Sequence, residues 1–78
     1  MEELIKYLKW HSWATYNDVE YRHPIKGNRY LSVTIDRNEA LAELKHFHHN
    51  HEEINDFDLG FVKPHIILDI LKTYPDYI

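Results

Sequence analysis

The sequence predicts a single small α+β domain spanning residues 1–78, in the order helix, β-hairpin, helix, helix, with the helices packed on a short antiparallel sheet. Three patterns lead to this prediction. Apolar residues recur at helical spacing near the N-terminus, apolar and polar residues alternate on either side of a central Gly-Asn pair, and helical spacing returns near the C-terminus. Because 78 residues bury one core at most, we expect one domain without a separate substrate-binding unit.

The first predicted helix covers residues 2–13. Its apolar stripe follows the spacing of an amphipathic helix and consists of Met1, Leu4, Ile5, Leu8 and His11. Tyr7, Trp10 and Trp13 fall outside this narrow stripe. They either widen the buried face or form an exposed aromatic patch, and general burial tendencies favour the core.

A β-hairpin is predicted next. Val19 and Tyr21 alternate with charged residues, and residues 30–35 place three branched apolar side chains on one face. Residues 24–28 between them contain Pro, Gly and Asn, which favour a tight turn. Two strands are marginal in isolation, so we expect helices to cover them or a second copy of the chain to pair with them as a homodimer.

The third predicted element is a helix that begins after Asp36. Asp36 and Glu39 have the spacing of a capping box, in which both side chains bond to exposed backbone N–H groups of the first turn. The predicted inner face of this helix consists of Ala40, Leu41, Leu44, Phe47, His48, His51 and Ile54. The predicted solvated face carries His46, His49 and Glu53.

The last predicted helix begins at Pro64, because the first turn of a helix tolerates a missing N–H group. Pro75 is expected to end it. Its helical spacing is carried by Ile67, Ile70, Leu71 and Tyr74.

Charge is divided unevenly along the chain, which has a formal net charge of −4 with the histidines neutral. Residues 1–35 hold five Lys and Arg against four Asp and Glu, whereas residues 36–78 hold four against nine. An acidic surface attracts basic partners and can occupy a channel built for nucleic acid. We therefore expect a non-enzymatic binding protein, an inhibitor or regulator of the phage type that mimics nucleic acid and engages a nucleic-acid-processing protein partner. The predicted acidic face consists of Glu39, Glu43, Glu52, Glu53, Asp56 and Asp58.

The predicted hairpin supports a second hypothesis from another functional class. Its turn and flanking strands carry three fixed positive charges beside aromatic rings, a combination that contacts phosphates and stacks on bases. This hypothesis makes the chain an RNA-binding or RNA-cleaving domain. The residues that would bind RNA are Tyr21, Arg22, Lys26, Arg29 and Tyr30.

Parts of the chain resemble the HicA-type mRNA-interferase toxins. The similar segments are residues 3–13, Tyr21-Arg22-His23-Pro24, residues 27–33 and residues 63–72. The resemblance implies a double-stranded-RNA-binding-like layout of helix, hairpin and helix, and a toxin-type activity on RNA. At the spacing of the family's catalytic histidine this chain has Asp18, so no catalytic residue is carried over. Residues 37–61 are expected to form a helical insertion that the family lacks.

A third hypothesis concerns the histidine-rich stretch at residues 46–53. Imidazoles and carboxylates three or four apart on a helix can meet at one transition-metal ion. The candidate ligands are His46, His49 and Glu53, although this spacing places only two ligands on each helix face. No other cofactor is expected, because the chain has two glycines, no phosphate-binding Gly-rich loop and no serine or cysteine nucleophile with a partner set.

The composition also bounds the compartment. The sequence has no cysteine, begins with Met1-Glu2-Glu3 and contains no apolar run of the roughly 20 residues that a membrane-spanning helix requires. We therefore expect a cytoplasmic protein without disulfides and without membrane contact.

Overall fold

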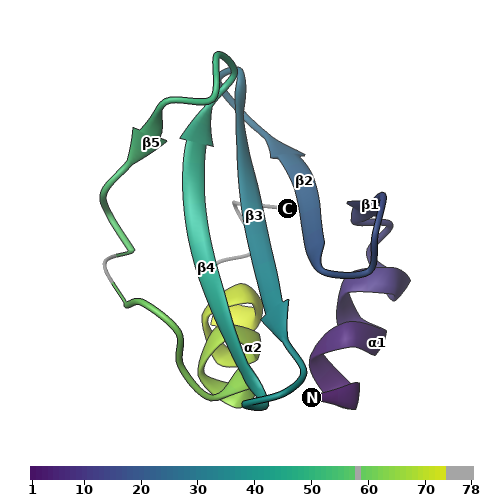
Figure 1. Cartoon of the computed structure of the whole chain (residues 1–78). Coiled ribbons are helices and arrows are strands. Elements are labelled where there is room, and N and C mark those ends of the chain that lie inside the picture. Colours follow the sequence, from purple (N-terminus) through teal and green to yellow (C-terminus); the bar gives the residue numbers. More distant parts are fainter. Residues whose placement is uncertain (58, 74–78) are drawn as a thin grey trace.

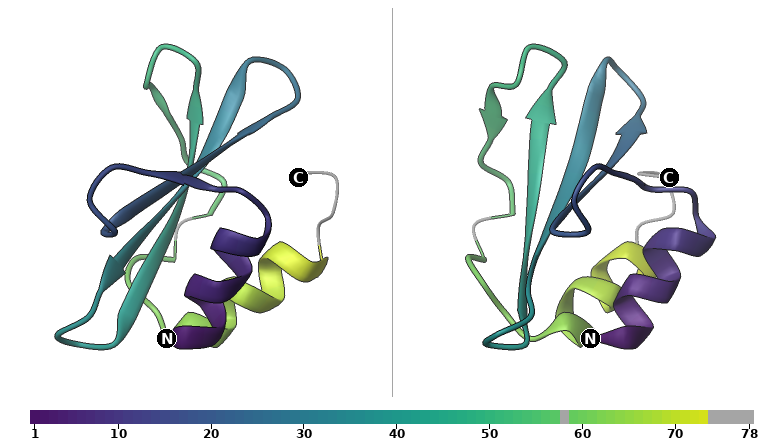
Figure 2. Two further views of the ribbon diagram at one scale, coloured as in Figure 1. Left: turned by 90° about the vertical axis from the view of Figure 1, so that its right-hand side faces the viewer. Right: turned by 45° about the vertical axis from the view of Figure 1, so that its right-hand side comes forward.

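In the part of the chain that the structure describes, five antiparallel strands form one sheet in the order β1-β2-β3-β4-β5, and two helices lie on the same side of it (Figures 1 and 2). The computed structural model describes residues 1–57 and 59–73. The elements are α1 (Glu2–Trp10), β1 (Ala14–Thr15), β2 (Glu20–Ile25), β3 (Arg29–Asp36), β4 (Leu41–His48), β5 (Glu53–Ile54) and α2 (Pro64–Thr73). The prediction of a small α+β domain is confirmed, with one helix fewer and more strands than the sequence patterns indicated.

The core lies between the helices and one face of the sheet. Side chains alternate between the two faces of a strand, so the branched residues predicted for the second strand all point toward the helices, as expected. Both helices contribute leucines and isoleucines from one side, as amphipathic helices do. The buried apolar residues of this covered face are Leu4, Leu8, Trp13, Tyr21, Leu31, Val33, Ile35, Ala42, Leu44, Ile67, Leu68 and Leu71.

The predicted hairpin of β2 and β3 is confirmed. The strands pair from Glu20 opposite Thr34 to Ile25 opposite Arg29. The turn between them contains Gly27 and Asn28 at φ angles of 80° and 55°. Glycine and asparagine tolerate this left-handed region best, which is why this turn could be located from the sequence.

The predicted helix after Asp36 is wrong, because residues 41–48 form strand β4. Its buried side chains, Ala42, Leu44 and His46, follow a period of two and lie opposite Ile35, Val33 and Leu31 of β3. Pairing with β4 gives hydrogen-bond partners to the β3 edge that would otherwise be exposed.

The predicted capping box forms a turn. The Asp36 carboxylate accepts hydrogen bonds from the backbone N–H groups of Asn38 and Glu39, at 3.0 and 3.2 Å. These are the bonds that a helix cap makes, but Ala40 follows at a φ of 55°, so the chain reverses into β4. The same side chain can therefore start a helix or close a hairpin.

Helix α1 ends earlier than predicted, at Trp10. Ser12 takes a left-handed φ of 62° and the Trp13 N–H donates to the Leu8 carbonyl oxygen at 2.9 Å, which turns the Trp13 ring into the core. The aromatic residues outside the apolar stripe thus divide: Trp13 is buried, Tyr7 is half-buried and Trp10 is 85% exposed.

Helix α2 begins at Pro64 and buries Ile67 and Leu71, as predicted. The predicted contribution of Tyr74 and the predicted stop at Pro75 lie outside the described residues. Neither helix of the described part of the chain is long and apolar enough to span a membrane.

Leu44 tests the strand assignment, because a side chain that is 1% exposed at the centre of β4 leaves a cavity when truncated. Leu44→Ala is expected to lower the free energy of unfolding by about 2–5 kcal/mol in urea denaturation. Leu59→Ala, at a position that is 40% exposed, is the matched control and is expected to cost less than about 1 kcal/mol. Equal losses for the two variants would contradict the packing described above.

Candidate nucleic-acid interface

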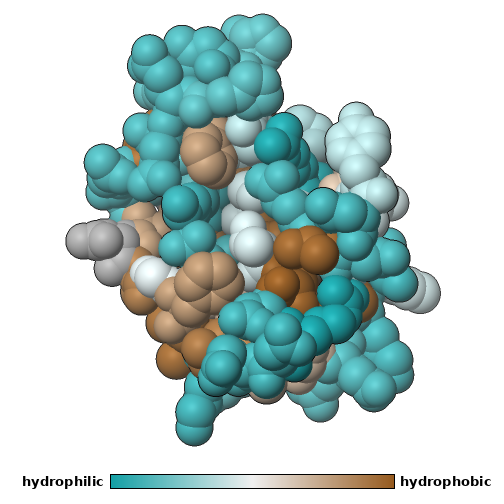
Figure 3. Space-filling view, in the orientation of Figure 1, coloured by the Kyte–Doolittle hydropathy of each residue, from teal (hydrophilic) through white to brown (hydrophobic). Residues whose placement is uncertain are grey.

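The second face of the sheet is not covered by the helices, and we call it the open face. In Figure 1 this face is turned toward the viewer, with α2 behind β4. The strand register sets its composition in cross-strand rows. These rows consist of Glu20, Thr34 and Glu43; Arg22, Ser32 and Lys45; and Pro24, Tyr30, Phe47 and Glu53. The space-filling view shows a mainly hydrophilic surface with separate apolar spots (Figure 3).

An aromatic pair occupies one end of the open face. Tyr30 of β3 and Phe47 of β4 are cross-strand neighbours whose rings stack with centroids 5.1 Å apart and an interplanar angle of 16°. The Arg22 guanidinium lies over the Tyr30 ring, 5.1 Å from its centroid. The Tyr30 hydroxyl forms a 2.7 Å hydrogen bond with Nδ1 of His51. Contacts with Phe47, Arg22 and His51 therefore hold the Tyr30 ring in place from three directions.

A polar network fixes Arg22 beside this pair. The hydroxyl of the buried Ser32 donates to Glu20 Oε2 at 2.6 Å, and Glu20 Oε1 lies 3.1 Å from Nη2 of Arg22. Partial burial by itself raises the pKa of Glu20, but the hydrogen bonds from Ser32 and Arg22 and the charge of Arg22 together bring that pKa below its ordinary value. The Glu20 carboxylate, held by Ser32, therefore fixes the orientation of the Arg22 guanidinium.

Two turns meet at the same end of the sheet. The His49 N–H donates to the Asn28 carbonyl oxygen at 2.7 Å, which joins the turn after β4 to the turn after β2. Both turns lie at the top of Figure 1. We call this region the basic end, because its charged and titratable residues are Lys26, Arg29, His48, His49 and His51, with Glu52 as the acid.

The structure brings together four of the five residues predicted to bind RNA. Arg22 and Tyr30 lie on the open face, and Lys26 lies at the adjoining basic end, where Arg29 Nε donates to the Lys26 carbonyl oxygen at 3.1 Å. Arg29 shares this end, but the alternation of β3 turns it to the same side as Leu31, away from the open face. The prediction that Tyr21 contacts RNA is wrong. The alternation of β2 turns it to the covered face, where it is fully buried and its hydroxyl donates to the Asp18 carboxylate at 3.2 Å.

Sequence reasoning missed Phe47, His51 and Ser32 at this site. Phe47 was assigned to the buried side of a helix, whereas strand pairing places it beside Tyr30. A period-two alternation from Leu41 to Phe47 is the signal that would have found it.

The acids predicted to form one face are distributed over the sheet. Glu39 lies in the turn between β3 and β4, at the opposite end from Glu52. Glu43 and Glu53 lie 3.6 and 3.3 Å from Nζ of Lys45, between them. Asp56 lies 3.0 Å from Nδ1 of the buried His46, and Asp58 lies outside the described residues.

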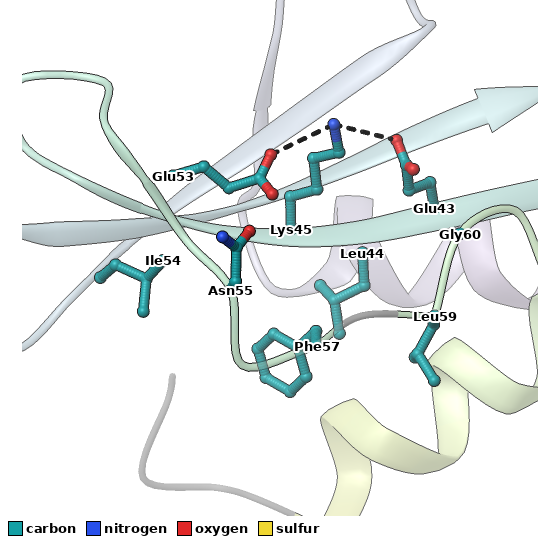
Figure 4. Close-up of a pocket in the computed structure, with 9 residues that line it drawn as sticks. All are labelled: Glu43, Leu44, Lys45, Glu53, Ile54, Asn55, Phe57, Leu59 and Gly60. Carbon is teal, nitrogen blue, oxygen red and sulfur yellow. Dashed lines mark ion pairs between the residues drawn. The ribbon is translucent and has the colours of Figure 1, made fainter.

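Lys45 and the carboxylates of Glu43 and Glu53 line one side of a hollow beside β4 (Figure 4). The hollow has a volume of about 240 Å³. It lies between β4 and the segment after β5, which pairs with β4 again at the bridge between Ala42 and Val62. Its polar rim holds two carboxylates against one ammonium group, because Lys45 contacts both Glu43 and Glu53, and this excess of negative charge disfavours a phosphate. We therefore place the candidate site on the Tyr30 surface.

The residues proposed as metal ligands are not brought together. His46 is buried under the covered face, His49 lies in an exposed turn and Glu53 extends over the open face toward Lys45. Within residues 1–57 and 59–73, no group of three His, Cys, Asp or Glu side chains has a metal-binding arrangement. That hypothesis depended on helical spacing, which the strand replaces.

Comparisons with protein-family models, curated proteins and solved structures found no significant match to this chain. The assignment of the site therefore depends on its own geometry and chemistry.

The Glu20 network predicts a pH-dependent contribution to stability. Because the folded-state pKa of Glu20 is below its ordinary value of 4.5, the contribution is complete above that pH and is lost as the pH falls through the lower folded-state pKa. Glu20→Gln is expected to be less stable than the parent chain at pH 7 in urea denaturation, with a difference that shrinks below pH 4.5. Glu39→Gln, in an exposed turn, is the control, and a Glu20→Gln difference that stays constant down to pH 3 would argue against the network.

Proposed function

We propose that this protein binds single-stranded RNA on its open face, at the end formed by Tyr30, Phe47 and Arg22 and continued by Lys26 at the turn. The observation that carries this proposal is the stacked Tyr30 and Phe47 pair with the Arg22 guanidinium held over it. Unstacked bases gain about 1–3 kcal/mol each by stacking on aromatic side chains. An arginine plane contributes cation–π contact to the same stack.

The chemistry favours a single strand over a duplex. A flat sheet face can stack only bases that are splayed out, and single-stranded RNA exposes its bases in this way. Lys26 is exposed at the turn beside the aromatic pair, so it can contact the phosphate backbone there, and Arg29 is half-exposed at the same end of the hairpin. Aromatic stacking and phosphate contacts are therefore available on adjoining surfaces.

The overall net charge of −4 does not prevent such binding, because the carboxylates of the open face are paired. Glu20 is paired with Arg22 beside the aromatic pair, and Glu43 and Glu53 share Lys45 in the neighbouring rows. Ion pairing reduces the repulsion that these groups exert on a phosphate. We expect modest affinity with a clear dependence on salt.

The order of elements is compatible with the layout implied by the resemblance to HicA-type toxins. Residues 37–61, which were expected to form a helical insertion, contain the strand β4. The described chain therefore has one helix before a single antiparallel sheet and one helix after it. At the family's catalytic position, Asp18 instead accepts the hydroxyl of the buried Tyr21. The proposal is therefore binding, with no cleavage step assigned.

The acidic-face hypothesis stays a prediction. Its described acids lie at both ends of the sheet, and Glu43, Glu53 and Asp56 each contact a Lys or His side chain. Such pairs present less net negative charge to a basic partner than free carboxylates would. The placement of the aromatic pair gives RNA binding the stronger support.

Charge reversal at the turn tests the proposal. Lys26→Glu is expected to weaken binding of a short uridine-rich RNA in fluorescence anisotropy, and to reduce the slope of log affinity against log salt by about 0.7 or more, because at least one phosphate contact is lost. Lys6→Glu, on α1, makes the same change in net charge away from the open face and is expected to leave the slope unchanged. Identical losses in both variants would show that net charge alone governs the affinity.

A further inference from the structure

A second hollow opens on the same face, beside the aromatic pair. Its volume is about 160 Å³ and it is lined by Ala14, Tyr16, Asn17, Glu20 and Arg22. A cavity of about 150 Å³ holds one benzene ring, so this open hollow has room for one ring of a planar base, and the second ring of a purine would extend from its mouth. Tyr16 at its rim is fully exposed, at 101% of the reference area. The core therefore gains nothing from this ring.

The wall that carries Tyr16 has a fixed shape. The side-chain oxygen of Asn17 accepts from the N–H groups of Val19 and Glu20 at 3.0 and 3.1 Å. The Asp18 N–H donates to the Thr15 hydroxyl at 3.0 Å, and Asp18 takes a left-handed φ of 57°. A tight turn thus presents Tyr16 across from β2. Local side-chain to backbone bonds of this kind hold a short loop without help from the core.

The opposite wall presents a carboxylate and a guanidinium side by side. An ionised carboxylate has about four acceptor positions, and Glu20 uses one on each oxygen, for Ser32 and Arg22. A guanidinium has five N–H donors, so Arg22 keeps several of them free for a ligand beyond its pair with Glu20. Both side chains are more than a third exposed, at 35% for Glu20 and 43% for Arg22. A ligand can therefore reach both the carboxylate acceptors and the guanidinium donors.

Guanine matches this pattern better than the other bases. Its N1–H and N2–H₂ groups are adjacent donors that one carboxylate accepts together, and its O6 and N7 atoms are adjacent acceptors for arginine. Adenine presents an acceptor at N1, where guanine has its donor, so the carboxylate repels it. Uracil and cytosine lack the N7 acceptor.

We propose that the hollow between Tyr16 and the Glu20 and Arg22 pair is a guanine pocket, with Glu20 on the donor edge, Arg22 on the acceptor edge and Tyr16 stacking on the base. This inference rests on the proposed RNA binding and deepens it. Arg22 belongs to both sites, since it borders the hollow and lies over Tyr30. A bound strand therefore passes from a base-selective pocket to a stacking surface that accepts any base.

The test compares two hexameric RNAs that differ at one position, a uridine hexamer carrying a single guanine and the same hexamer carrying a single adenine. The full chain is expected to bind the guanine hexamer about 5- to 150-fold more tightly in fluorescence anisotropy. Tyr16→Ala and Glu20→Gln are expected to bring this ratio close to one. Trp10→Ala removes another highly exposed aromatic ring, at 85%, from α1 and is the matched control, with the ratio retained.

The possible results separate the pocket from the proposed function. Binding of both hexamers and of the uridine hexamer with equal affinity overturns the guanine pocket and leaves RNA binding standing. A guanine preference that survives both Tyr16→Ala and Glu20→Gln also overturns it. Failure to bind any of the RNAs overturns both proposals. Because Tyr16 makes no contribution to the core, Tyr16→Ala keeps the test valid even if Glu20→Gln does not fold.

Discussion

The pairing of β3 with β4 is the interaction on which the rest of the structure depends. Eight residue pairs, from Arg29 opposite His48 to Asp36 opposite Leu41, fix the register along the full length of both strands. A shift of β4 by one residue against β3 would turn Ala42, Leu44 and His46 from the core to solvent. The hydrophobic core therefore specifies the register, and the register determines which side chains share the open face.

The chemistry of the open face is a consequence of that register. Tyr30 and Phe47 stack because they are directly opposite each other, and Ser32, Arg22 and Lys45 share the neighbouring row. The row of Glu20 and Glu43 lies next to the row of Arg22 and Lys45, so Arg22 forms an ion pair with Glu20 and Lys45 forms one with Glu43. An exposed sheet face with an oriented guanidinium over an aromatic ring is suited to stacking a planar ligand. The two sites proposed on this face adjoin through Arg22.

The sequence contained local signals for much of this arrangement. The turn at Gly27 and Asn28, the alternation of β3 and the start of α2 at Pro64 all depend on nearby residues, and all were predicted. Strand β4 could not be separated from a helix in the same way, because Leu41 and Leu44 fit both periods and Asp36 can cap a helix or close a turn. The burial of His46 depends on Asp56, ten residues further along and across a strand pair. Such contacts are set by tertiary packing, which overrides local propensity.

Only the part of the candidate site that depends on nearby residues could be predicted from the sequence. Arg22, Lys26, Arg29 and Tyr30 belong to one hairpin, so their proximity followed from the turn. Phe47 and His51 join them only through β4 and the turn that follows it. Tyr21 was misplaced, because the face to which a strand residue points is decided by what covers the sheet.

RNA binding on the open face is tested most directly by titrating the ¹⁵N- and ¹³C-labelled protein with a uridine hexamer and following the NMR chemical shifts. We expect the largest shifts on the ring of Phe47, the side chain of Arg22 and the backbone around Tyr30 and Lys26, while α1 and α2 stay unchanged. Shifts concentrated on the helices, or no shifts at millimolar RNA in low salt, would contradict it.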